Sequence, residues 1–283
     1  MPPLVSCVVL AHDQLDRTRA CLRSLLLSAH RPLEIVAVDN GSQDGTGEWL
    51  NGFGKEAEAA GVSLRIHSTG KNEGCSTARN LGLSLARGEV VAFMDNDTAL
   101  RTRGWVERFL EAFRDPSVAM IGPKLLFPWV PFPVECAGCS VSRDGWVVYR
   151  GRGEPRETPA FSAPCEVQAL ISAWIASPRA WLEKAGGFDE HFNPIQFEDI
   201  DLCYRLRVKG GKVLYLPSVE HYHFEGGTST KTAGLNFRYS TIRNGMKFKA
   251  RWKAVVENEN GPERAPPWRD IEKKPPAEPL PII

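Results

Sequence analysis

Two acidic clusters are the residues of this sequence best suited to chemistry. The first, Asp95-Asn96-Asp97, directly follows the apolar run 90–94. Mg²⁺ and Mn²⁺ bind one or two protein carboxylates and leave coordination places for phosphate oxygens. The triplet therefore suggests a metal site that could serve a diphosphate. The structural alternative is an Asx turn at the end of a strand, which needs no metal.

The second cluster, Glu198-Asp199-Ile200-Asp201, stands at the predicted start of a helix. Acids are favoured in a first helical turn, and capping alone explains one or two of them. Three carboxylates so close together repel one another. The cluster is therefore a candidate source of the general base that removes a proton from an attacking hydroxyl.

Histidine and cysteine pairs offer further ligands. His221 and His223 follow a predicted strand and alternate across an extended segment, so only one of them is expected to face the site. An imidazole beside two carboxylates suits manganese. Cys136 and Cys139 have the spacing of half a zinc site, but the sequence has no second pair of this spacing. We expect free loop thiols there.

These clusters need a scaffold that places them together. Apolar runs at 5–10, 33–38, 64–67 and 90–94 alternate with helical patterns through the first 120 residues. The alternation predicts an α/β fold with a mostly parallel central sheet and helices on both faces. Such folds bind ligands at the carboxyl ends of their strands.

The residues at those strand ends are predicted to hold a nucleotide. Ala11 and Asp13 follow the first strand, Asp39 ends the second, and Arg79 lies in the helix before the fourth. A carboxylate there can accept a nucleobase imide hydrogen, and arginine pairs with phosphate.

Three segments are expected along the chain: 1–122 as the nucleotide-binding half, 123–256 as the acceptor-binding and catalytic half of the same domain, and 257–283 as a mobile, proline-rich tail. In the second half, 123–164 looks like a long loop region. Helices are predicted at 178–185, 198–209 and 234–256, with a strand at 212–216.

The composition limits the kinds of partner that the protein is expected to bind. Thirty-five basic residues nearly cancel 34 acidic ones, so no nucleic acid partner is expected. Seven scattered cysteines and the lack of a secretory signal or an apolar run of spanning length predict a cytoplasmic protein. The basic stretch from Arg243 to Lys253 is either a solvated helix face or a peripheral contact with the inner face of an anionic membrane.

The ordered set of motifs resembles glycosyltransferase family 2 of the GT-A fold, and within it the bacterial rhamnosyltransferase-like branch. The resemblance covers about residues 4–250. It rests on Val-Asp-Asn-Gly-Ser at 38–42, Asn-Glu-Gly-Cys-Ser at 72–76, Ala-Arg-Asn-Leu-Gly at 78–82, Asp95-Asn96-Asp97, Gly-Gly-Phe-Asp-Glu at 186–190, Phe-Glu-Asp-Ile-Asp-Leu-Cys at 197–203, and His223 ahead of Gly226-Gly227.

The resemblance implies a role for each matching residue. Asp39 would contact the donor base, Arg79 the diphosphate, and Asp95 the donor, with Ala11, Asp13 and Asn96 beside it. Asp97 would hold Mn²⁺ or Mg²⁺ with Asp95 and His223. Asp199 would be the general base, with Glu198 and Asp201 orienting the acceptor or its neighbours.

The implied activity is inverting transfer of one sugar from a nucleotide-diphospho-sugar, with TDP-rhamnose as one candidate donor. The acceptor would be a saccharide or a lipid-linked molecule in cell-surface polysaccharide or glycolipid synthesis. The Gln-x-x-Arg-Trp motif of processive synthases is broken, since Phe248 precedes Arg251-Trp252. A non-catalytic sugar-nucleotide-binding protein and a nucleotidyltransferase are the alternatives.

Overall fold

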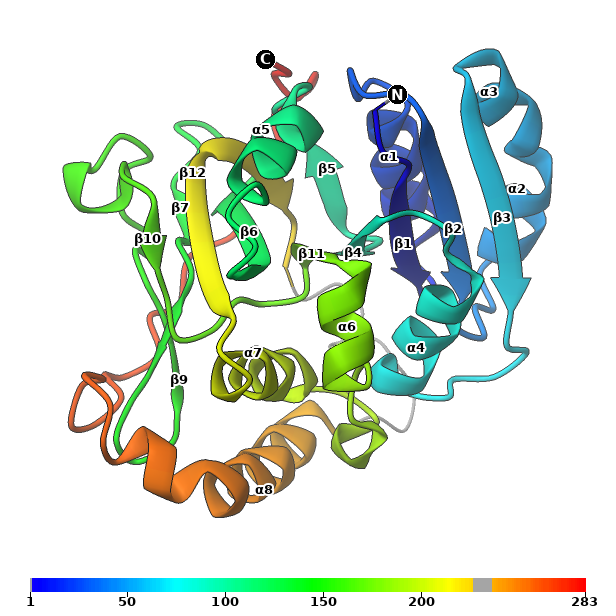
Figure 1. The fold of residues 1–283 in the computed structure, drawn as a ribbon. Helices are drawn as coiled ribbons and strands as arrows, with labels where there is room; N and C mark the ends of the chain where they lie inside the picture. The colour runs from blue at the N-terminus through cyan, green and yellow to red at the C-terminus, as the bar shows by residue number, and fades with distance from the viewer. Residues whose placement is uncertain (1, 226–235) are drawn as a thin grey trace.

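The computed structural model describes residues 2–225 and 236–283. Among them, ten strands form one sheet, whose main path runs β10-β12-β6-β11-β4-β1-β2-β3. A hairpin of β8 and β9 lies outside it (Figure 1). The strands are β1 (Val5–Ala11), β2 (Leu33–Asp39), β3 (Val62–Ser68), β4 (Val90–Asp95), β5 (Thr98–Leu100), β6 (Val118–Leu126), β7 (Val134–Cys136), β8 (Cys139–Val141), β9 (Val147–Tyr149), β10 (Cys165–Glu166), β11 (Trp174–Pro178) and β12 (Lys212–His223).

The first half of the sheet is parallel, as the sequence predicted. β1 pairs in parallel with β2 and β4, and β2 pairs in parallel with β3. Ala11, Asp39 and Asp95 therefore stand at one edge, at the carboxyl ends of their strands. In the second half, β11 is antiparallel to both β4 and β6, so the whole sheet is mixed.

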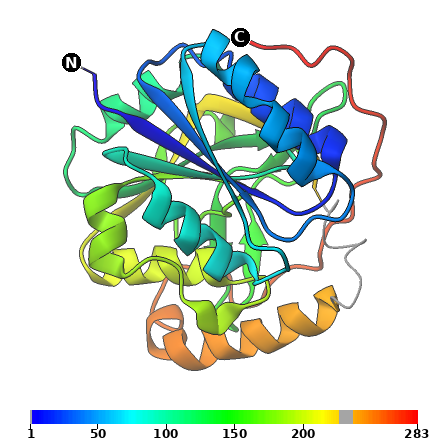
Figure 2. The same ribbon diagram turned by 90° about the vertical axis from the view of Figure 1, so that its right-hand side faces the viewer.

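Helices cover both faces of the sheet (Figure 2). They are α1 (Leu15–Leu25), α2 (Thr46–Gly52), α3 (Gly54–Ala59), α4 (Cys75–Leu85), α5 (Trp105–Ala112), α6 (Arg179–Ala185), α7 (Glu198–Val208) and α8 (Phe237–Val256), with 3₁₀ turns η1 (Pro159–Phe161) and η2 (Glu190–Phe192). Helix α4 lies close to β1, because a Cβ on Gly82 would come 2.3 Å from Cγ1 of Val8. This close approach brings Arg79 to the functional edge of the sheet.

The predicted long loop at 123–164 is only partly correct. The segment contains the end of β6, the three-residue strands β7, β8 and β9, and η1. Prolines and glycines interrupt these strands before a repeating pattern can be recognised. In the same way β12 continues to His223, well past its predicted end at Leu216.

The tail 257–283 contains no helix or strand, as predicted, yet it lies against the domain. Its end pairs with the segment after β5: the Ile283 carbonyl accepts from the Arg103 amide, and the Ile283 amide donates to the Arg101 carbonyl. Further back, the Arg152 side chain donates to the Arg269 carbonyl. The predicted mobility of this tail stays a prediction.

Candidate active site

Residues of both acidic clusters line one cavity of about 690 Å³ at the carboxyl ends of β1 and β4. Asp95 and Asp97 lie on its sheet side, and Glu198 and Asp199 enter it from the start of α7. His223, at the end of β12, also lines it. The fold thus brings together residues more than 120 positions apart in the chain.

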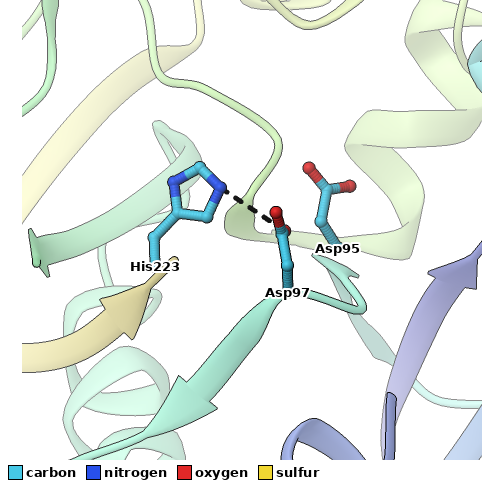
Figure 3. A group of neighbouring side chains, drawn as sticks. All are labelled: Asp95, Asp97 and His223. Carbon is cyan, nitrogen blue, oxygen red and sulfur yellow. Dashed lines mark ion pairs between the residues drawn. The ribbon is translucent and has the colours of Figure 1, made fainter. Parts of the chain in front are cut away.

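Asp95, Asp97 and His223 form a group suited to a metal ion (Figure 3). One ligand atom from each residue lies within 4.8 Å of the other two. His223 Nε2 is 3.5 Å from Asp97 Oδ1. Two carboxylates and one imidazole are a donor set that fits Mn²⁺ or Mg²⁺ and leaves places for phosphate oxygens.

Electrostatics at His223 are consistent with this group. Burial alone would lower the pKa of His223, but the carboxylates of Asp97 and Glu135 outweigh it and raise the pKa well above its ordinary value. The histidine therefore sits in a strongly negative environment, which would favour any cation.

His221 is excluded from the metal group. Its ring stacks on Trp174 with centroids 3.6 Å apart, and its Nδ1 accepts from the Arg101 amide. Burial lowers the pKa of His221 well below its ordinary value, so the ring is neutral. Of the two histidines, His223 is the one that faces the acids.

Cys136 and Cys139 are free thiols, as expected, but they lie on strands and not in a loop. They lie buried on β7 and β8, with their sulfur atoms 3.8 Å apart. Among the residues that the structure describes, neither belongs to a group that could hold a metal.

Arg79 joins the two acidic clusters. Its guanidinium donates to Asp95 Oδ1 at 2.6 Å and to Glu198 Oε1 at 2.7 Å, and only 3% of the residue is exposed. Burial and the charge of Asp199 raise the pKa of Glu198 to about 7, against the opposing effect of Arg79. Arg79 also lines the cavity, where it could reach a phosphate. The phosphate contact expected of it stays a prediction.

Asp199 is half-buried and is better placed than Glu198 to accept a proton from a hydroxyl in the cavity. Its Oδ2 accepts from the Ser172 amide and its Oδ1 from the Ile200 amide, both at 2.8 Å. These bonds fix the carboxylate, while an ionised carboxylate has about four acceptor sites in all. Acceptor capacity is therefore left for a hydroxyl in the cavity.

Asp201 does not belong to the site, contrary to the expectation. It is fully buried, does not line the cavity, and pairs with Arg205 and Arg251 while accepting from the Trp252 indole. The third acid of the cluster therefore fastens α8 to α7.

We expect Asp201→Ala to lower the free energy of unfolding by about 3–5 kcal/mol, because two arginines lose a buried counter-charge. Urea unfolding followed by circular dichroism measures this. The control is Asp16→Ala, where an aspartate that is 95% exposed pairs with Arg19, and the expected change is below about 1 kcal/mol. Equal stability of the two variants would contradict the structural role.

The residues predicted to bind the nucleotide lie at the edge of the sheet where the cavity is found. Ala11, Asp13 and Asp39 do not themselves line that cavity. Asp39 is nearly buried and its Oδ1 accepts from the Ser42 amide. Its neighbour Asn40 lines the cavity, as Asn72 does. The nucleobase contact of Asp39 stays a prediction.

Ala11 and Asp13 flank the lining residue His12, whereas Asn96 lines the cavity itself. The Asn96 side chain donates to the Asp13 carbonyl and to Thr18 Oγ1, both at 2.8 Å. These bonds hold the turn after β1 against the end of β4. Any donor contacts of Ala11 and Asp13 stay predictions.

Several lining residues were missed from the sequence. Trp146, Tyr149 and Arg152 come from the segment interpreted as a loop, and Trp268 and Lys273 from the tail. The paired aromatic and glycine residues at 145–153 were the available signal, since a tryptophan that stays at a surface often marks a binding site.

Residues 6–128 match the model of Glycosyl transferase family 2. The chain is 30% identical over 200 residues to the pre-mycofactocin glycosyltransferase of Mycobacterium tuberculosis, a match covering 70% of this chain and 39% of that protein. It is 24% identical over 269 residues to the glucosyl-dolichyl phosphate glucuronosyltransferase of Haloferax volcanii, covering 88% of this chain and 74% of that protein.

Among solved structures, the chain resembles a mannosyltransferase of Pyrobaculum calidifontis determined with GDP-Man and Mn²⁺. The TM-score is 0.64 at 17% identity, over 93% of this chain and 66% of that one. The fold is therefore GT-A. The chain spans only 39% of the mycobacterial relative's length, so activity and substrates do not transfer from that protein by similarity alone.

Proposed function

We propose that this chain, which carries a glycosyltransferase family 2 domain over residues 6–128 and has the GT-A fold, is an inverting, metal-dependent glycosyltransferase. It would move one sugar from a nucleotide-diphosphate donor to an acceptor hydroxyl. The observation that carries the proposal is the single cavity lined by Asp95, Asp97 and His223 together with Asp199.

In this proposal, proton transfer takes place at one side of the cavity and the diphosphate leaves at the other. Asp199 accepts the proton of the acceptor hydroxyl, whose oxygen bonds to the anomeric carbon as the bond to the diphosphate breaks. A single displacement of this kind inverts the anomeric configuration. Asp95, Asp97 and His223 would hold a divalent ion, which would supply positive charge for the leaving diphosphate.

Arg79 supports this division. Its guanidinium pairs with Asp95 on the metal side and with Glu198 beside the proposed base. A fixed cation between the two acidic clusters offsets their repulsion and holds them at constant separation. Arg79 therefore organises the site whether or not it also reaches a phosphate.

The proposed donor is a nucleotide-diphosphate sugar. The mannosyltransferase neighbour was solved with a GDP-sugar and Mn²⁺, which supports a nucleotide-diphosphate sugar and this metal. TDP-rhamnose enters from the sequence resemblance. Transfer of a single sugar is favoured because Phe248 stands where the Gln-x-x-Arg-Trp motif of processive synthases has its glutamine.

Product analysis tests the proposal. The protein would be incubated with UDP-, GDP- and TDP-sugars, with and without Mn²⁺, and the nucleotides separated by chromatography. Metal-dependent release of a nucleoside diphosphate supports a glycosyltransferase. Release of pyrophosphate would instead indicate a nucleotidyltransferase, and tight donor binding without turnover across a range of acceptors would indicate a degenerate protein.

The acceptor would be a saccharide or a lipid-linked molecule, and α8 favours its presentation at a membrane. This helix carries no acidic residue between 237 and 256, and Tyr239, Ile242 and Met246 are exposed along one side of it. The start of the same helix lines the cavity through Phe237 and Thr241. In the described residues, no helix is both long and apolar enough to cross a bilayer.

We expect the protein to co-sediment with vesicles containing phosphatidylglycerol at low salt and to be released at high salt. Ile242→Asp combined with Met246→Asp should weaken this binding about tenfold or more, because both apolar and electrostatic attraction are lost. The control is Val208→Asp, an exposed apolar position on α7. The proposed membrane contact is wrong if the wild type does not bind these vesicles, or if the double variant binds them as well as the wild type does.

A further inference from the structure

A buried carboxylate on β7 is unexplained by the reaction. Glu135 is fully buried, and neither of its oxygens makes a hydrogen bond within the described part of the chain. Two buried donors face it and are likewise without a hydrogen bond there: His223 Nδ1, 3.5 Å from Oε2, and Arg152 Nη1, 3.7 Å from Oε1.

Such a group is costly to keep for stability alone. A buried charge without hydrogen bonds is unfavourable, and an apolar side chain would fill the same space on β7. The separations exceed ordinary hydrogen-bond lengths by only about 0.5 Å, so small side-chain movements would close them. The arrangement is that of a network which tightens when one member gains a partner.

We propose that Glu135 is a positioning residue for the metal site, acting through His223. With a metal bound, its carboxylate would accept the Nδ1 hydrogen of His223, which would leave the Nε2 lone pair for the metal that Asp97 also holds. Histidine ligands commonly donate their second ring nitrogen to a carboxylate, which fixes both the tautomer and the ring plane. This inference rests on the metal site of the proposed function.

Arg152 provides the counter-charge and connects the C-terminal tail to the site. Its Nη2 pairs with Glu225 at 2.9 Å, its Nε donates to the Arg269 carbonyl at 2.9 Å, and its guanidinium lies 4.2 Å from the ring centre of Trp268. The tail therefore holds the arginine that neutralises Glu135.

The test is direct Mn²⁺ binding to the full chain, measured by calorimetry in the presence of the nucleoside diphosphate that the wild type binds, and repeated with Mn²⁺ alone. Glu135→Gln removes the charge with little change of shape. We expect Mn²⁺ affinity to fall about 10- to 100-fold, with metal-free nucleotide affinity unchanged. The control is Glu111→Gln, the same change at an exposed glutamate on α5 that pairs with Arg114, away from the cavity.

Glu135→Asp guards against a folding defect, because it keeps the charge but moves it away from His223. It should give an intermediate loss of Mn²⁺ affinity in a protein with wild-type circular dichroism. Mn²⁺ affinity within twofold of wild type in both variants would overturn the inference and leave the proposed function standing. A wild type that binds no Mn²⁺ under either condition would overturn both.

Discussion

Replacing Asp199 with Asn is expected to lower kcat by about 10²- to 10⁴-fold while leaving donor affinity within a few-fold of wild type. The amide has nearly the shape of the carboxylate and can still accept one of the two backbone bonds from Ser172 and Ile200. What it loses is the ability to take a proton. The measurement is steady-state release of nucleoside diphosphate beside calorimetric donor binding.

The matched comparison is Glu198→Gln. Glu198 is nearly buried and pairs with Arg79, so its loss should disturb the link to Asp95 and affect donor affinity as well as kcat. Near-wild-type turnover of Asp199→Asn combined with an inactive Glu198→Gln would reverse the assignment and make Glu198 the base. Asp201 is no longer a candidate, because its carboxylate is enclosed by Arg205, Arg251 and Trp252.

The first half of the fold could be predicted because its local sequence pattern and its tertiary packing favour the same helices and strands. Strands β1, β2 and β4 are buried on both faces and appear in the sequence as continuous apolar runs. The helices between these strands have apolar residues at helical spacing. The second half lacked such signals, since β7, β8 and β9 have three residues each and their pairing is set by distant partners.

The site was predictable from the ordered set of motifs more than from any one of them. Asp95-Asn96-Asp97 alone is a weak signal, because an Asx turn explains such a triplet as well, and only the ordered set of motifs pointed to a metal. The structure places Asp95 and Asp97 at the cavity, and their metal-binding role stays a prediction. Asp201 shows the limit of this reasoning: an acid beside Asp199 in sequence points about 200° away around the helix, and only packing shows that α8 supplies its partners. Glu135 carried no signal at all, because its role depends on His223, 88 positions later.

Asp97→Ala is expected to abolish Mn²⁺-dependent donor binding and to lower kcat/KM by about 10²-fold or more. The change removes one of the three proposed ligands, and Asp95, another of the three, has its Oδ1 engaged by Arg79. Metal-independent binding of the nucleotide should persist, since Asn40 and Asn72 also line the cavity and do not belong to the metal group. Calorimetry with the preferred donor, with and without Mn²⁺, measures both quantities.

Stability distinguishes a lost metal ligand from a damaged fold. Asp97 lies beside Asp95, so its removal relieves a repulsion between like charges, although it also ends the contact with His223. We therefore expect a thermal midpoint close to wild type in the absence of metal, and a smaller rise than wild type when Mn²⁺ and donor are added. A variant that keeps the full Mn²⁺-dependent rise would show that the metal binds elsewhere, and the proposed division of the cavity into a metal side and a base side would fail with it.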